Sequence, residues 1–183
     1  MTIITNWYST DNKEGVNLNQ TQTISPTANP DYPAPSFALL ERVQGCQGSE
    51  WVFVKASTTV TQFMAVVIDN LGNANDATSA LIASNVYAMG IAEFQTTQAN
   101  PGDYFWALLK ADGGVAVNVS PSVGRGVPMY IAAATPGAFT SSANTTRINN
   151  ISLIASIGTS ASGPGEAMIF AYMQPSQNFT SSA

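Results

Sequence analysis

A succession of short β-forming runs, separated by turn residues, dominates the chain from about Phe37 onward. Trp51–Lys55 and Val60–Ile68 are rich in aromatic and β-branched residues, and Gly, Pro, Asn and Asp stand between the runs. Helical turns are expected at most at Phe37–Val43 and Asp76–Ala83. The pattern predicts an all-β fold, a small antiparallel β-barrel or sandwich, without deciding between the two. The remaining expected strands are Val86–Phe94, Tyr104–Lys110, Val115–Val119, Val127–Ala132, Ile151–Ile157 and Glu166–Tyr172.

Two turns have clear local signals. Asp112-Gly113-Gly114 stands between two apolar runs, and Asp-Gly at such a place is a strong signal for a β-hairpin. Gly45-Cys46-Gln47-Gly48 predicts a turn before the Trp51 strand. The polar stretch Thr140–Asn149 is expected to be an exposed loop.

The first 36 residues differ from the rest and predict an extended N-terminal arm, residues 1–36, before a β-barrel or sandwich body, residues 37–183. Thr, Asn and Gln dominate the arm, and four prolines cluster at its end. Proline fixes φ and lacks an N–H donor, so this stretch is neither a helix nor a central strand. Two apolar patches interrupt it, and they are the predicted partner-contacting residues: Ile3, Ile4, Trp7, Tyr8, Val16 and Leu18. The alternatives are an arm that folds back on its own body and an arm that is disordered.

Charged residues make up only 9% of the chain, and the net charge is −5. The six basic residues are scattered, so no nucleic-acid partner and no membrane partner is expected. A surface of neutral polar residues loses little hydration energy when another protein covers it, which suits a subunit of an assembly. The alternative is a soluble protein with neutral polar loops.

The composition argues against catalysis. Histidine is absent and Cys46 is the only cysteine, so a disulfide within the chain and a zinc site are excluded, and no cofactor or metal is expected. Most aspartates lie beside turns, where they usually bond to their own backbone. The acidic stretch Asp69–Asp76 departs from a calcium-binding EF-hand loop. The aromatics between Trp51 and Trp106 are expected in the core rather than in a sugar platform. We therefore predict no catalytic residues and a protein that is not an enzyme.

The N-terminus lacks the basic and apolar regions of a signal peptide, and apolar runs such as Phe63–Ile68 are far too short to span a bilayer. Synthesis in the cytoplasm is therefore expected.

The order of several short motifs resembles that of small structural proteins of tailed bacteriophages. A Gly-Ser precedes an aromatic strand that ends in Lys-Ala-Ser, a Gly-Ile-Ala follows, and a Gly-Asp opens a second aromatic strand. About three quarters of the chain is covered, and the arm is excluded. The matching stretches are Leu40–Gly45, Gly48–Ser57, Met89–Ala92, Gly102–Ala107, Gly126–Tyr130 and Ala167–Phe170.

This resemblance is to capsid decoration (cement) proteins, which sit on the outside of a phage head and clamp its major capsid protein. It implies a location on the virion, the major capsid protein as partner, and self-association into a homotrimer. Two other readings stay open: a head-fibre or receptor-binding module that recognises host surface glycans, and a carboxylate-based glycosidase.

Overall fold

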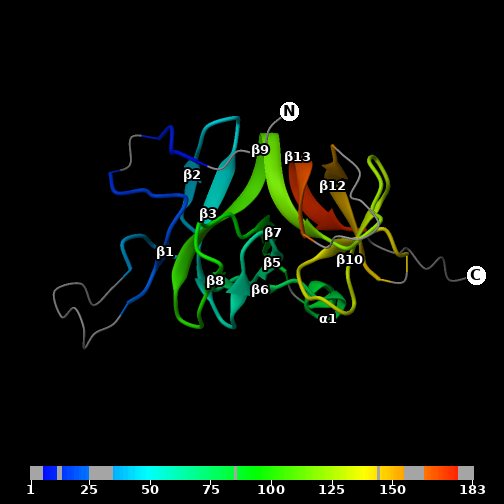
Figure 1. The fold of residues 1–183 in the computed structure, drawn as a ribbon. Helices are drawn as coiled ribbons and strands as arrows, with labels where there is room; N and C mark the ends of the chain where they lie inside the picture. Colours follow the sequence, from blue (N-terminus) through cyan, green and yellow to red (C-terminus); the bar gives the residue numbers. More distant parts are fainter. Residues whose placement is uncertain are drawn as a thin grey trace, which may run out of the picture.

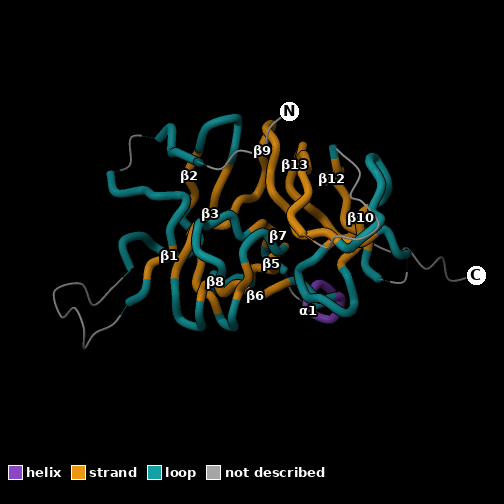
Figure 2. The backbone as a smooth tube through the Cα atoms, in the orientation of Figure 1, coloured by secondary structure: helices purple, strands orange, loops and turns teal. Residues whose placement is uncertain are grey.

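The computed structural model describes residues 6–11, 14–24, 35–84, 86–143, 145–154 and 163–176. It is nearly all β, with 48% strand and 3% helix, and contains a closed five-stranded barrel with further strands attached. Figure 2 shows strands through the whole body, with the short helix Ser79–Ala83 beside them. The predicted all-β fold is therefore confirmed, and the choice between barrel and sandwich, which the sequence left open, is a closed barrel in the structure. No helix in the described residues is long and apolar enough to cross a membrane.

The early strands are β1 (Thr21–Gln22), β2 (Arg42–Gln44), β3 (Glu50–Ala56), β4 (Val60–Thr61), β5 (Ala65–Ile68) and β6 (Asn73–Asp76). After helix α1 (Ser79–Ala83) come β7 (Ala88–Ile91), β8 (Gln98–Ala99), β9 (Tyr104–Val119), β10 (Met129–Ile131), β11 (Phe139–Thr140), β12 (Arg147–Leu153) and β13 (Gly163–Pro175).

Strand pairing closes two rings of five strands that share β9. The first ring runs β9-β7-β5-β6-β3 and returns to β9, and the second runs β9-β13-β12-β10-β11 and returns to β9. In Figure 1, β9 passes between β3 and β6 on one side and β12 and β10 on the other. The first half of β9 pairs with β3 and the second half with β13. One long strand therefore holds the two rings in a fixed relation.

The predicted Asp112-Gly113 hairpin is wrong, because β9 continues through it as one strand of 16 residues. Neither Gly113 nor Gly114 adopts the positive φ that a tight hairpin turn requires. The register with β13 shifts here. Ala111 pairs with Ile169 and Val115 pairs with Ala167, so β9 runs four positions along the chain while the antiparallel β13 runs only two. The glycines thus form a bulge where β9 changes from one ring to the other.

Alternate residues of the central strands enter two different cores. Val52 and Val54 of β3 belong to one buried cluster, whereas Trp51 and Phe53 belong to the other. The same division holds along β5 and the first half of β9. Because successive side chains point to opposite faces of a strand, burial on both faces requires an apolar run instead of polar alternation. This is why Trp51–Val54 carries no polar residue.

The expected helical turns and the expected strand Val60–Ile68 are only partly confirmed. Helix α1 confirms the helical turns expected at Asp76–Ala83, and the Thr78 hydroxyl caps it by accepting from Leu81 N–H. Phe37–Val43 forms no helix. The single run Val60–Ile68 divides into β4 and β5, and Phe63 between them has a φ of 64°.

The described part of residues 1–36 is not an extended arm, which corrects that prediction. Residues 6–11 and 14–24, the N-terminal segment, fold back on the body, as in one of the alternatives. Strand β1 pairs with β9, Thr10 N–H donates to Gln44 O, and Gln95 N–H donates to Asn19 O. These contacts cover strand edges that would otherwise be open to other chains. The clustered Pro26, Pro30 and Pro33 lie outside the described residues.

Candidate interaction surface

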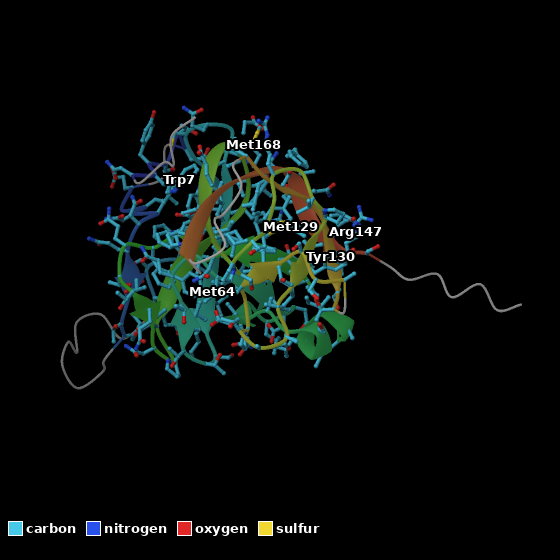
Figure 3. All side chains as sticks on the ribbon, turned by 45° about the vertical axis from the view of Figure 1, so that its right-hand side comes forward. Trp7, Met64, Met129, Tyr130, Arg147 and Met168 are labelled. Carbon is cyan, nitrogen blue, oxygen red and sulfur yellow. The ribbon has the colours of Figure 1, made fainter. Side chains whose placement is uncertain are left out.

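The predicted partner-contacting residues have different positions in the structure. Trp7 and Leu18 are 2% and 1% exposed and belong to the larger core cluster, so their expected exposure to a partner is corrected. Trp7 packs edge-to-face on Trp51 with ring centroids 5.3 Å apart. In Figure 3, Trp7 lies well away from Tyr130 and Arg147 of the second ring. The physical reason is that burial of the large apolar surface of a Trp side chain stabilises the folded chain, whereas its exposure to water does not.

The remaining predicted partner-contacting residues differ in their exposure to solvent. Val16 is partly buried against the same core cluster. Tyr8 is 63% exposed and stays available for a partner. Ile3 and Ile4 lie outside the described residues.

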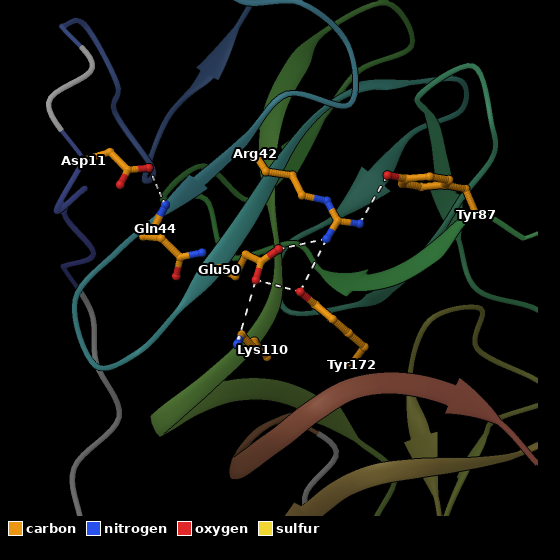
Figure 4. A network of polar contacts seen from close by, with 7 residues as sticks. All are labelled: Asp11, Arg42, Gln44, Glu50, Tyr87, Lys110 and Tyr172. Carbon is orange, nitrogen blue, oxygen red and sulfur yellow. Dashed lines mark hydrogen bonds and ion pairs between the residues drawn. The ribbon is translucent and has the colours of Figure 1, made fainter.

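A different set of side chains converges around Glu50, at the N-terminal end of β3 (Figure 4). Its Oε1 accepts from Arg42 Nη1 at 2.8 Å, and its Oε2 accepts from the Tyr172 hydroxyl at 2.7 Å. Lys110 Nζ lies 3.8 Å from Oε2. Arg42 also donates from Nη2 to the Tyr87 hydroxyl at 3.2 Å. Both carboxylate oxygens are thus engaged within the chain.

These residues come from distant parts of the sequence. Arg42 is on β2, Lys110 on β9 and Tyr172 on β13, and Tyr87 immediately precedes β7. The four strands are joined in sequence by pairing, because β2 pairs with β3, β3 with β9, and β9 with β13. The site therefore lies across the junction between the two rings.

The cations also contact aromatic rings. The Arg42 guanidinium carbon lies 5.7 Å from the ring centroid of Tyr87 and 5.5 Å from that of Tyr172. Lys110 Nζ lies 5.7 Å from the centroid of Tyr172. Such cation–π contacts contribute roughly 0.5–1 kcal/mol each at exposed sites. The rings and cations are thereby held in one arrangement.

Hydrogen bonds set the charge state of the cluster. Burial of Glu50 opposes its charge, but hydrogen bonds from Tyr172, Arg42 and Gln44 outweigh it and keep the pKa of the carboxyl below its usual value. Burial also opposes the Arg42 charge, yet hydrogen bonds with Tyr87 and Glu50 raise the pKa of the guanidinium. The hydrogen bond to Glu50 raises the pKa of the Tyr172 hydroxyl. The ionised form of the network is the stable one at neutral pH.

The aromatic rings of this cluster remain accessible to another molecule. Tyr87 is 46% exposed and Tyr172 is 41% exposed. We define the cation–aromatic face as Arg42, Glu50, Tyr87, Lys110 and Tyr172. Beside it, Tyr87 and Met173 line an open groove of about 800 Å³. The groove and the face together form a preorganised surface with apolar and hydrogen-bonding groups.

Two other carboxyls are strongly perturbed but lie apart from this face. Burial raises the pKa of Glu93 to about 8, although Ala116 N–H, at 2.8 Å, favours its charge. The Trp7 indole also lies close enough to favour that charge, but its N–H does not reach hydrogen-bond geometry. Burial raises the pKa of Asp76 to about 7. Neither carboxyl is accompanied by enough further acidic or sulfur groups to hold a metal, within the part of the chain that the structure describes.

Asp69 and Asp103 behave as the sequence predicts for turn aspartates, whereas Asp76 lies in β6 and Asp112 lies in β9. Asp69 accepts from Leu71 N–H at 2.8 Å and from Asn73 N–H at 2.9 Å, which closes its own turn. Asp103 accepts from Asn100 N–H at 2.8 Å. These carboxylates are occupied in shaping loops.

Sequence reasoning missed the cation–aromatic face. Arg42 and Lys110 looked scattered because they lie 68 positions apart in the sequence, and β2 and β9 meet only through β3. Comparison of the sequence with protein-family models and with curated proteins finds no match.

Proposed function

We propose that this protein is a capsid decoration protein that binds the outside of a phage head and stabilises the lattice of the major capsid protein. The observation that carries the proposal is the cation–aromatic face, held rigidly across the junction of two β-rings. The resemblance of the strand motifs to cement proteins supports it independently. In this proposal the protein is located on the virion surface, acts as a homotrimer and catalyses no reaction.

The face has the chemistry of a protein-binding surface. Tyr and Arg are enriched among the few residues that dominate interface energies. The Tyr172 and Tyr87 hydroxyls and the Glu50 carboxylate are already paired within the chain, so covering them leaves few unsatisfied groups. The sparse charge of the rest of the surface further lowers the cost of desolvation.

The physical effect on a phage head follows from mass action. A ligand that binds the assembled lattice but not free capsid subunits stabilises the lattice by an amount that grows with its concentration. A trimer would present three copies of the face, so its avidity for a repeating lattice would exceed that of one copy.

Cosedimentation of the full-length protein with purified, undecorated heads tests the proposal. We expect saturable binding, and we expect Tyr172→Ala to weaken it at least tenfold, which corresponds to about 1.4 kcal/mol. Leu71→Ala is the matched control, because Leu71 is 68% exposed and lies outside the face.

The outcomes separate the competing ideas. Absence of binding by the unmodified protein contradicts the function itself. Full binding by Tyr172→Ala together with loss in Tyr8→Ala would move the contact to the N-terminal segment, as the sequence predicted. Light scattering of the free protein at working concentration measures whether it is a trimer.

A further inference from the structure

A second cavity lies beneath the N-terminal segment, away from the cation–aromatic face. It has a volume of about 220 Å³ and is lined by four aromatic rings of the body and by polar residues of the N-terminal segment. Figure 1 shows β1 of this segment beside the first ring, at the edge opposite to β12 and β10. We name this cavity the aromatic pocket.

The aromatic rings form a packed platform. Phe53 stacks on Tyr104 with centroids 5.8 Å apart, and Phe37 packs edge-to-face on Trp106 at 5.2 Å. Phe53 and Trp106 are each 2% exposed and form the floor, whereas Phe37 and Tyr104 are only half-buried. The accessible apolar surface of the pocket therefore comes from the rims of Phe37 and Tyr104.

The polar lining consists of amides and hydroxyls. Gln22 Nε2 donates to Ser36 Oγ at 2.9 Å, and Gln22 Oε1 accepts from Ser36 N–H at 3.3 Å, which fixes this side chain at the mouth. Asn17 Oδ1 accepts from Asn19 N–H at 3.0 Å, so its amide is fixed as well. Gln20 is exposed beside them. Each amide carries both a donor and an acceptor.

Charge and size restrict the ligand. Among the residues that the structure describes, no charged side chain lines the pocket, and Lys55 Nζ lies 5.8 Å from the ring centroid of Tyr104, which does line it. A drug-sized ligand or an extended peptide needs a cavity of roughly 300–1,000 Å³. The aromatic pocket is smaller, so it suits one compact ring with apolar faces and several hydroxyls.

We propose that the aromatic pocket binds one monosaccharide unit of a neutral glycan, with an apolar sugar face against Phe37 and Tyr104 and its hydroxyls bonded to Asn17, Gln20 and Gln22. Aromatic carbon surfaces accept C–H groups of a sugar, and fixed amides match vicinal hydroxyls. The site goes beyond lattice binding and does not depend on it. It exists only because the N-terminal segment folds back on the first ring.

Titration of the full-length protein with the methyl glycosides of glucose, galactose, mannose and N-acetylglucosamine tests this site. Saturation-transfer NMR and the fluorescence of Trp106 report binding. We expect at least one glycoside to bind with a Kd in the millimolar range. We expect Tyr104→Leu to weaken it about tenfold and Gln20→Ala to weaken it severalfold.

Tyr172→Leu is the matched control, because it removes a tyrosine ring beside a lysine outside the pocket, and it should leave binding unchanged. Gln20 is exposed, so Gln20→Ala decides the matter if Tyr104→Leu does not fold. The proposal is overturned if no glycoside binds, if both pocket variants bind like the unmodified protein, or if only a proline-rich peptide competes for the pocket. Head binding by the pocket variants is measured in parallel, so loss of sugar binding and loss of lattice binding are distinguished.

Discussion

Glu50 and Glu93 both expose little of their surface to solvent, yet the pKa values of their carboxyls shift in opposite directions. Glu50 lies among Arg42, Lys110 and the Tyr172 hydroxyl, which hold its pKa below the usual value. Glu93 has one backbone donor, Ala116 N–H, and burial raises its pKa to about 8. Glu50 lies near the protein surface among cations, whereas Glu93 lies deep in the core with one donor, so depth of burial and hydrogen-bond partners together decide the charge.

The two regions therefore respond to pH in opposite ways. The Glu50 network contributes stability that is present above pH 4.5, the ordinary carboxyl value, and is lost as pH falls through its lowered folded pKa. For Glu93 the unfolded carboxyl ionises near 4.5 and the folded one near 8. Between these values the unfolded chain binds fewer protons, so folding stability declines as pH rises from about 4.5 to about 8.

The largest expected effect is that of Trp7→Ala, which should remove the difference between Glu93 and Glu50 by opening the core around Glu93 to water. Loss of a buried Trp should lower the free energy of unfolding by about 3–5 kcal/mol. Urea denaturation at pH 6 measures this. The same variant should bring the pKa of Glu93 back toward 4.5, because water gains access to the carboxyl. Unchanged stability would mean that the N-terminal segment is not docked in solution. Tyr8→Ala is the control, because Tyr8 is the exposed aromatic neighbour.

Glu93→Gln should remove the pH response of Glu93 and leave that of Glu50 to be measured by itself. The amide can still accept from Ala116 N–H but cannot ionise, so the variant should be more stable at pH 8 by roughly 2–4 kcal/mol, at about 1.4 kcal/mol for each pKa unit. Asp76 acts in the same direction only up to about pH 7. Of these two carboxyls, only Glu93 therefore contributes to the decline in stability between pH 7 and pH 8. A decline in stability there as steep as in the unmodified protein would contradict the assignment.

The smallest expected effect is that of Glu50→Gln, which removes the other pH response. We expect a loss of about 1 kcal/mol at pH 7, because Arg42 and Lys110 are partly exposed and water replaces their partner. The difference from the unmodified protein should vanish below the folded pKa of Glu50. Thermal unfolding between pH 3 and 7 measures both points. A difference that stays constant with pH would indicate a packing effect instead of a charge effect.

Local patterns in the sequence were enough for the fold class and most strand positions. Trp51–Lys55 became β3, and Glu166–Tyr172 lies within β13, because an apolar run flanked by turn residues has few alternatives to a buried strand. The hairpin predicted at Asp112-Gly113 is absent because β3 pairs with the first half of β9 and β13 pairs with the second half, which keeps the strand extended. The hydrogen bonds of these two pairings outweigh the preference of two residues for a turn.

The sequence by itself determined that the chain is ion-poor, lacks histidine and folds as a succession of short strands, since composition and alternation are local properties. Only the tertiary structure decided that Trp7 and Leu18 are core residues and that Arg42, Glu50, Lys110 and Tyr172 meet at one surface. The physical reason is that strand pairing joins residues by the order of strands in space. That order depends on the free energy of the whole core and not on any segment read alone.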